Sequence, residues 1–419
     1  MQIHPRIGPL IRHEIGSYQR PNRVPRVVRV TTVRPPRAVS RKTVRLLATA
    51  YGLTIANLYY CQPLLPEIAR SLGPHAADHL VAVGQLGYAL ALIIIVPLGD
   101  IVPRRPFLAV LLCCDAAALA LTATAPTAGL LLAAGALIGL TAAAVVNTLI
   151  PYAAALVALD ERGRAIGTML TGGLTGVLLS RTVAGLVSQV AGWRALFVGA
   201  AVVTLLLAVV LTRVMPLAPP DLALPYRAQL RATVRLAATH RLLRRRSFIG
   251  ACSFAAFGVF WSTAAFRLSE PPYEYGPAQI GLLALAGAAG AVVARPLGRT
   301  ADRADRVRLT RATLALGAVS FAALWAGGHH VAWLLIGLLA MDTAVNAVHL
   351  LNMSVVYGID DARARLASVY MTVYTLGGVV GAAVGPSVHA VGGWSATCLL
   401  GAAFLAIALV LTFTRTENP

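Results

Sequence analysis

The sequence has few charged residues for its length, and very few acidic ones. Only 12% of its 419 residues are Asp, Glu, Lys or Arg, whereas 58% are hydrophobic. A water-soluble domain cannot bury that much apolar surface, which excludes an ordinary globular protein. The apolar residues form separate runs of roughly 20, the length with which a helix crosses a bilayer core of about 30 Å. Because lipid offers the backbone no hydrogen-bond partners, these Ala/Leu/Val-rich runs predict membrane-spanning helices rather than barrel strands.

Motifs of catalysis, nucleotide binding and metal binding are also lacking. The sequence contains no H-E-x-x-H, no G-x-S-x-G and no G-x-x-x-x-G-K-[ST] pattern. Their absence disfavours a polytopic membrane enzyme and an ATP-driven pump. The cysteines all fall inside apolar runs without metal-ligand spacing, so we expect buried, reduced thiols at Cys61, Cys113, Cys114, Cys252 and Cys398. We therefore expect neither a metal nor another cofactor.

Basic residues are in large excess, 36 against 16 acidic, which gives a net charge of +20. They lie between the apolar runs and only in alternate gaps, a pattern typical of membrane topology rather than of nucleic-acid binding. The sequence predicts a multi-pass protein of the cell membrane with an even number of spans and both termini in the cytoplasm. The basic gaps contain Arg104–Arg105, Arg162–Arg164, Arg227–Arg246, Arg299–Arg311 and Arg363–Arg365.

The apolar runs predict twelve spans in two groups of six. The first group is 44–69, 78–102, 106–125, 128–157, 164–190 and 194–215, and the second is 247–268, 277–300, 308–327, 331–357, 365–390 and 394–413. Residues 1–43 are predicted to form a disordered basic cytoplasmic tail. Residues 216–246 form a linker in which apolar and basic residues alternate, which predicts a helix on the anionic inner leaflet.

The two groups of spans repeat each other. At an offset of 201, Gly176 falls on Gly377 and Gly192-Trp193 falls on Gly393-Trp394. At an offset of 202, Asp100 falls on Asp302. A set of such matches in corresponding loops indicates internal duplication, and parallel six-helix repeats are a known transporter architecture.

Two loops carry a family resemblance. The stretch Gly298-Arg-Thr-Ala-Asp302-Arg303-Ala-Asp-Arg306 resembles the loop signature G-x-x-x-D-R-x-G-R-R of the major facilitator superfamily. The first-half copy, Val96-Pro-Leu-Gly99-Asp100-Ile-Val-Pro-Arg104-Arg105, keeps the Asp and the basic pair. The resemblance implies an all-α polytopic membrane protein with two pseudo-symmetric bundles, 44–215 and 247–415. It also implies a monomer that moves a small-molecule substrate by alternating access.

The loop residues have two interpretations. An Asp at a helix end can face the positive N-terminus of a neighbouring helix and pair with Arg residues, which suits a gate. The alternative is that they are solvated caps and topology charges. The candidate gate residues are Asp100, Arg104, Arg105, Gly298, Asp302, Arg303 and Arg306.

The chain departs from the superfamily's proton-coupled drug exporters in two spans. Their R-x-x-Q-G motif is replaced by Gly135-Ala-Leu-Ile-Gly139. In the motif G-x-x-x-G-P-x-x-G-G, the proline position is occupied by Arg181. These departures direct attention to Arg181 itself.

Charges deep in a span are functional candidates, because an unpaired one costs several kcal/mol. Arg181 lies roughly 13 Å and Asp342 roughly 16 Å from the outer ends of their predicted helices. We expect them to face each other across a central cavity, as a coupling pair or alternatively as a static ion pair. Asp342, Asn346 and His349 follow the spacing i, i+4, i+7, which predicts a polar stripe on one helix face.

Further cavity candidates lie on helices that line the cavity in the superfamily fold. They are Asn57, Tyr60, Gln62, Asn147, Trp261, Tyr370 and Tyr374. For any single Asn, an interhelical hydrogen bond is the alternative. The leading hypothesis is proton-coupled efflux of a drug-like compound or metabolite. The alternative is uptake or efflux of an organic anion or sugar, with Arg181 as the anion ligand.

Overall fold

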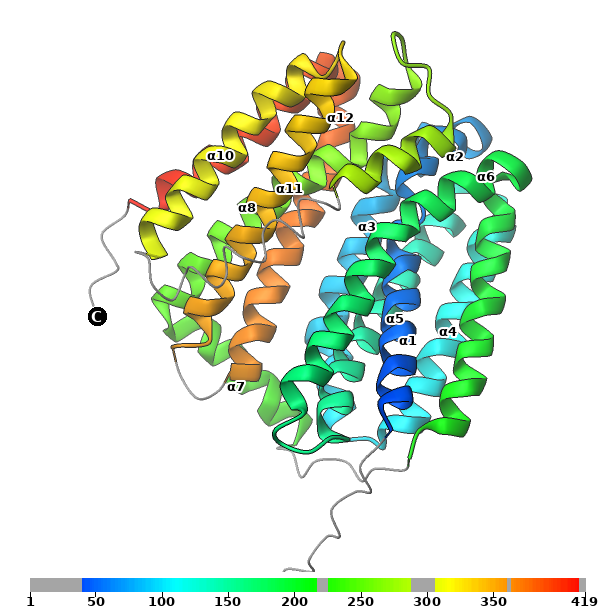
Figure 1. Cartoon of the computed structure of the whole chain (residues 1–419), viewed down its shortest axis with the longest axis vertical. Coiled ribbons are helices and arrows are strands. Elements are labelled where there is room, and N and C mark those ends of the chain that lie inside the picture. The colour runs from blue at the N-terminus through cyan, green and yellow to red at the C-terminus, as the bar shows by residue number, and fades with distance from the viewer. Residues whose placement is uncertain (1–39, 217–224, 288–305, 360–362, 414–419) are drawn as a thin grey trace, which may run out of the picture. The chain divides into compact units, whose positions relative to one another are not determined.

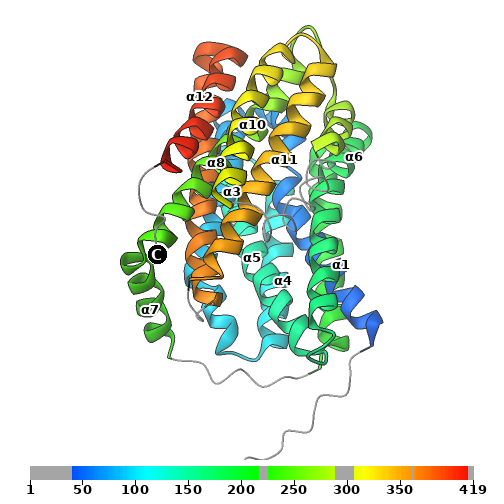
Figure 2. The ribbon, with the colours of Figure 1, turned by 60° about the vertical axis from the view of Figure 1, so that its left-hand side comes forward.

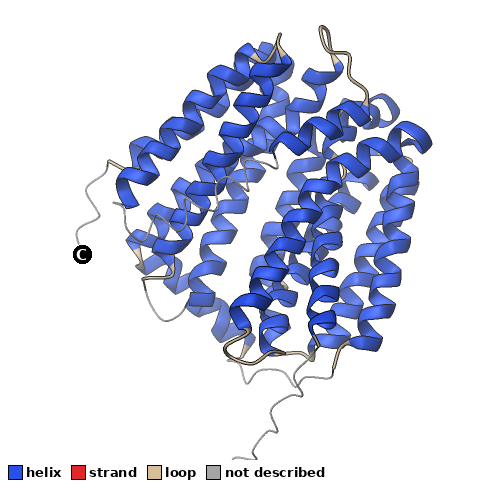
Figure 3. Cartoon of the chain, viewed as in Figure 1, coloured by secondary structure: helices blue, strands red, loops and turns tan. Residues whose placement is uncertain are grey.

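The chain is almost entirely helical in the residues that the computed structural model describes, which are 40–216, 225–287, 306–359 and 363–413. No strand occurs in these ranges (Figure 3). Close contacts divide the chain into Met1–Arg37 and Ala38–Pro419, and every described residue belongs to the second unit. Most of the predicted tail, 1–39, lies outside the described residues.

The first half begins with α1 and continues through seven further helical segments, and Figure 1 labels the α-helices among them. Their bounds are α1 Arg41–Tyr59, η1 Gln62–Leu64, α2 Leu65–Leu72, α3 Pro74–Ile94, η2 Val96–Asp100, α4 Arg104–Thr124, α5 Ala128–Ala155 and α6 Arg162–Val214. Prolines lie where two of the predicted spans are interrupted by 3-10 turns. Pro63 lies in the 3-10 turn that separates α1 from α2, and Pro97 lies in the one that follows α3 at Ile94.

The second half follows a short linker helix. Its elements are α7 Tyr226–Thr239, α8 Arg241–Ser269, a helical segment Pro277–Gly287, α10 Arg306–Ala326, α11 Val331–Val356 and α12 Arg363–Leu411. The helix α7 confirms the helix predicted in the linker, and it has no buried residue. Its Tyr226 hydroxyl donates to the carbonyl of Ile94 (2.9 Å), which ties it to the end of α3 (Figure 2).

Eight helices in the described ranges are long and apolar enough to cross a membrane. Two of them, α6 and α12, each contain two of the predicted spans. Gly192 (φ 80°) and Gly393 (φ 62°) interrupt these helices in a left-handed conformation that favours glycine. The remaining predicted spans correspond to α1 and to the segment that begins at Pro277. The predicted span 277–300 is described only as far as Gly287, and its residues 288–300 lie outside the described residues.

The repeat predicted from the sequence is visible in the packing. A Cβ on Gly176 of α6 would lie 2.0 Å from the carbonyl oxygen of Gly52 on α1. A Cβ on Gly377 of α12 would lie 2.0 Å from the carbonyl oxygen of Ala251 on α8. Each half therefore uses glycine at the same repeat position to let two helix backbones touch. The boundaries 44–215 and 247–415 remain a prediction.

The cysteine prediction was right for two residues and wrong for others. Cys61 and Cys398 are buried, but Cys113 and Cys114 are exposed and Cys252 is half-buried. The reason is that an apolar run in a membrane protein has a face turned to lipid, so hydrophobicity alone does not place a side chain in the protein interior.

Candidate functional site

Arg181 lies in the interior of the molecule, held by side chains from three elements. Its Nε donates to Gln62 Oε1 at 2.6 Å. Its guanidinium carbon lies 3.8 Å from the ring centre of Trp261, on α8, and 5.1 Å from that of Tyr59, on α1. Aromatic faces and a carbonyl oxygen stabilise a cation that lipid could not solvate. Its Nη2 is buried and has no hydrogen-bond partner.

Asp342 is the acidic counterpart of this cation. It is 6% exposed on α11, and its Oδ2 lies against Gly287, where a Cβ would come within 2.3 Å. Asp342 and Arg181 interact electrostatically. No direct ion pair joins these two described residues. The Oδ1 of Asp342 and the indole Nε1 of Trp261 are buried without a hydrogen-bond partner.

Both charges border one cavity of about 320 Å³. Its lining comes from α1, α3, α6, α8, α11, α12 and Gly287. The predicted candidates on this lining are Arg181, Asp342, Asn346, His349 and Tyr374. The predicted stripe on α11 therefore faces one cavity.

Aromatic rings form the wall around the stripe. The Tyr374 ring stacks on Phe254 with centres 4.3 Å apart and lies 4.7 Å from the His349 ring. Tyr370 is fully buried behind this layer, and its hydroxyl lies 3.3 Å from His349 Nδ1. The amide of Asn346 donates to the backbone carbonyl of Asp342 at 2.8 Å. The cavity thus combines two opposite charges with flat apolar surfaces.

Other predicted residues lie elsewhere. Asn57 and Tyr60 border a different cavity, between α1 and α6. Asn147 is not on the Arg181 cavity lining, and its Nδ2 donates to the Ala143 carbonyl (2.8 Å) and lies 3.4 Å from the Tyr88 hydroxyl. Gln62 and Trp261 both contact Arg181. Together with Arg181 they line a separate small cavity of about 20 Å³.

Several lining residues were missed by the sequence reasoning. On α1, the residues facing the cavity are Tyr51, Ile55, Leu58 and Tyr59, at the spacing i, i+4, i+7, i+8 of one helix face. On α3, Gln85 and Tyr88 also line it. The spacing i, i+3 of these two polar side chains within an apolar span could have indicated a face turned to the cavity. From α8 come Phe254 and Phe257.

Next to Arg181, the backbone of α6 packs closely against that of the segment Pro277–Gly287. The Thr182 hydroxyl donates to the Gly281 carbonyl at 2.9 Å. A Cβ on Gly281 would lie 2.4 Å from the Arg181 carbonyl oxygen, and one on Gly185 would lie 2.1 Å from that of Pro277. The segment Pro277–Gly287 therefore touches α6 directly, which leaves little room for a solute between them.

The candidate gate loops are only partly described. Gly298, Asp302 and Arg303 lie outside the described residues, as does the side chain of Asp100. Arg104 is buried at the start of α4, and Arg105 is half-buried beside it. Arg306 is exposed at the start of α10. The gate stays a prediction.

The family follows from comparison with known proteins. The model of the Major Facilitator Superfamily matches residues 47–359 and 273–419. The chain belongs to the Major Facilitator Superfamily. An uncharacterized transporter, YgaY of Escherichia coli O157:H7, is 39% identical over 381 residues, which is 90% of this chain and 96% of YgaY. A probable transporter of Streptomyces coelicolor, SCO4007, is 33% identical over 386 residues, 91% of this chain and 89% of SCO4007.

Solved structures of this superfamily share the fold. An inward-facing, occupied bacterial homolog of the lysosomal transporter Spinster aligns with a TM-score of 0.70 and 15% identity, covering 89% of this chain and 96% of the homolog. The nucleoside transporter NupG aligns with a TM-score of 0.70 and 13% identity, covering 88% and 100%. This superfamily member is therefore a multi-pass membrane transporter of small molecules and not an enzyme.

Proposed function

We propose that this transporter exports a small drug-like compound or metabolite in exchange for protons, by alternating access through the Arg181–Asp342 cavity. The observation that supports this is a pair of buried polar atoms without hydrogen-bond partners on residues that line one cavity, Arg181 Nη2 and Asp342 Oδ1. Buried polar groups are normally satisfied, so atoms left open at a cavity are suited to a ligand. A volume of about 320 Å³ fits a small solute.

Asp342 is the proposed proton carrier. A carboxylate buried in a span is costly when charged and much less so when neutral, so binding a proton changes the preferred environment of α11. Arg181 is its electrostatic partner, and a nearby positive charge favours the ionised carboxylate. Loss of that charge on protonation leaves Arg181 with an uncompensated positive charge, which favours a different arrangement of the two sides of the cavity.

A second candidate function is movement of an organic anion or a sugar. The open Nη2 of Arg181 favours the anion, because guanidinium groups bind carboxylates and phosphates through two parallel hydrogen bonds. In that case Arg181 holds the substrate itself. Asp342 then acts as the group that the anion displaces from its electrostatic contact with Arg181.

A two-stage experiment separates these functions. Compounds to which the chain confers resistance in an efflux-deficient cell are first identified, and their flux is then measured in proteoliposomes with and without a proton gradient. Export predicts flux that is accelerated by the gradient in wild type and indifferent to it in Asp342→Asn. Asp78→Asn, which removes a half-buried carboxylate outside the cavity lining, should behave as wild type.

Arg181→Ala distinguishes the substrate classes. Removal of a charge-assisted hydrogen bond should weaken binding of an anionic substrate by about 10- to 100-fold. Gradient-driven flux that is undiminished in Asp342→Asn would rule out Asp342 as the coupling carboxylate. Flux of organic anions alone, independent of the gradient, would establish the second candidate instead.

A further inference from the structure

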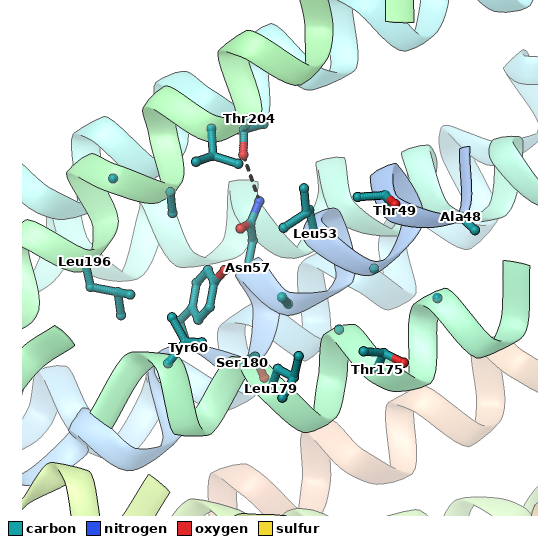
Figure 4. A pocket seen from close by; sticks show the side chains of 18 of the residues that line it. Ala48, Thr49, Leu53, Asn57, Tyr60, Thr175, Leu179, Ser180, Leu196 and Thr204 are labelled. Carbon is teal, nitrogen blue, oxygen red and sulfur yellow. Dashed lines mark hydrogen bonds between the residues drawn. The ribbon is translucent and has the colours of Figure 1, made fainter. Parts of the chain in front are cut away.

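A second and larger cavity lies away from the Arg181 site, between α1 and both parts of α6. Its volume is about 800 Å³. In the view of Figure 4, labelled α1 residues such as Asn57 lie between Thr204 of the second part of α6 and Ser180 of the first. Several lining side chains are exposed, including Leu179 (49%), Val183 (42%) and Val203 (43%). The cavity is therefore a groove open at the surface of α6, a helix long and apolar enough to cross a membrane.

The walls of this groove are apolar even where the residues are polar by type. The hydroxyls of Thr49, Thr171 and Thr175 each donate to the carbonyl four residues earlier in their own helix, at 3.1, 2.9 and 2.9 Å. The amide of Asn57 donates to Asp115 Oδ2 (2.7 Å) and to Thr204 Oγ1 (3.3 Å), and Figure 4 shows the bond to Thr204. Because these donors are already bonded within the protein, the groove suits a hydrocarbon chain.

One end of the groove is strongly basic. There it adjoins a hollow of about 280 Å³, and the two share Arg45 and Thr168. This hollow is lined by Arg41, Arg45 and Arg164, with a single acidic residue, Glu161. None of the three guanidinium groups has a hydrogen bond or ion pair within the described part of the chain.

Helix geometry adds to the positive charge at this end. Both α1 and α6 begin here, and neither has an acidic residue in its first turn. The positive ends of two helix dipoles therefore lie beside three arginines and only one acidic residue, Glu161, which is the N-cap residue of α6. Basic pockets of this kind, next to hydrophobic helix surfaces, bind anionic lipid headgroups.

We propose that this site binds one anionic phospholipid, with its phosphate between Arg45 and Arg164 and one acyl chain along the groove between α1 and α6. From Arg45 to Asn57 the helix rises about 18 Å. One leaflet of a bilayer has a hydrocarbon depth of about 15 Å, so the groove is long enough for an acyl chain. This site is distinct from the transport cavity and does not depend on the substrate.

The test compares two lipids with identical acyl chains, phosphatidylglycerol and phosphatidylcholine, on the purified full-length protein by native mass spectrometry. Wild type should bind phosphatidylglycerol more tightly. The double variant Arg45→Gln/Arg164→Gln should lose about 30-fold of that affinity, because each of the two arginines near the headgroup contributes about fivefold. Arg213→Gln removes an exposed arginine of α6 outside both cavity linings, and it should retain the preference.

A second variant tests the acyl chain separately. Gly199 lines the groove, and a Cβ there would meet no atom within 4 Å, so a side chain can leave the helix at this position and Gly199→Phe tests whether filling the groove matters. It should weaken both lipids, whereas Gly129→Phe, at another open position outside the groove, should weaken neither. Equal binding of the two lipids by wild type, equal losses in the Arg213 control, or unchanged binding in Gly199→Phe would each overturn the proposal. So would displacement of the lipid by millimolar-range inorganic phosphate alone, since that indicates a simple anion site.

Discussion

Two sets of buried polar side chains lie on different faces of α1. One set surrounds Arg181, which contacts the Tyr59 ring. The other set surrounds Asp115 of α4, which is fully buried and accepts hydrogen bonds from Asn57 Nδ2 and Thr141 Oγ1, both at 2.7 Å. The first set has open donors and acceptors, whereas both oxygens of Asp115 are satisfied. This difference supports the proposed ligand site at the first set and a role in helix packing for the second.

Substitutions at Asp115 test that structural role. Asp115→Asn should be close to neutral, because Asn still accepts from Asn57 and can donate to Thr141 Oγ1, which itself lies 2.9 Å from the Leu137 carbonyl. Asp115→Ala should lower the free energy of unfolding by about 2–3 kcal/mol, since it leaves a cavity and breaks both bonds. Thermal unfolding of the purified protein measures the difference.

The matched control is Asp160→Ala, an exposed position at which we expect a change within about 0.5 kcal/mol. If Asp115→Asn destabilised the protein as much as Asp115→Ala, then the negative charge, and not the acceptor pair, would be what the fold requires there. Asp115 would in that case become a candidate for coupling alongside Asp342.

At the scale of helices, small residues set which helices touch. A Cβ on Gly172 of α6 would lie 2.3 Å from the Ala48 carbonyl oxygen on α1. In the second half, a Cβ on Gly381 of α12 would lie 2.0 Å from the Ala255 carbonyl oxygen on α8. These contacts involve backbone atoms, which cannot move aside as a flexible side chain can. In membranes, where helices gain little from burying apolar surface against each other, such close packing supplies much of the association.

Gly176→Ala on α6 should therefore destabilise the protein by about 1–3 kcal/mol, through overpacking against Gly52. Gly167→Ala on the same helix should do the opposite and stabilise by up to about 1 kcal/mol, because a Cβ there meets nothing within 4 Å and alanine favours helix. Chemical unfolding in detergent reports both signs. Stabilisation by Gly176→Ala would show that α1 and α6 separate at no cost.

At the scale of the whole molecule, the sequence was sufficient for the spans but not for the whole cavity. Bilayer thickness imposes a length on every apolar run, so spans and repeat can be recognised without a structure. The stripe of Asp342, Asn346 and His349 was also predictable, because polar residues in an apolar helix mark a face. On α1, polar residues did not mark a single face. Asn57 and Tyr60 are buried on one face while Tyr51 and Tyr59 face the cavity on another, so polarity did not distinguish the two faces.

Membrane orientation is the remaining whole-molecule prediction. Arginines are frequent in the gaps near 104, 162 and 363 and scarce near 126 and 329. This bias predicts that the loop at Asp160 is cytoplasmic and that the loop at Thr127 is outside. Both residues are exposed, so a cysteine at either position is accessible to water-soluble reagents. In a variant without the five native cysteines, Thr127→Cys should react with a membrane-impermeant maleimide in intact cells, and Asp160→Cys only after permeabilisation. The reverse labelling would place the basic end of the α1–α6 groove in the outer leaflet. The phospholipid site would then draw on outer-leaflet lipids, while its arginines and acyl groove would be unchanged.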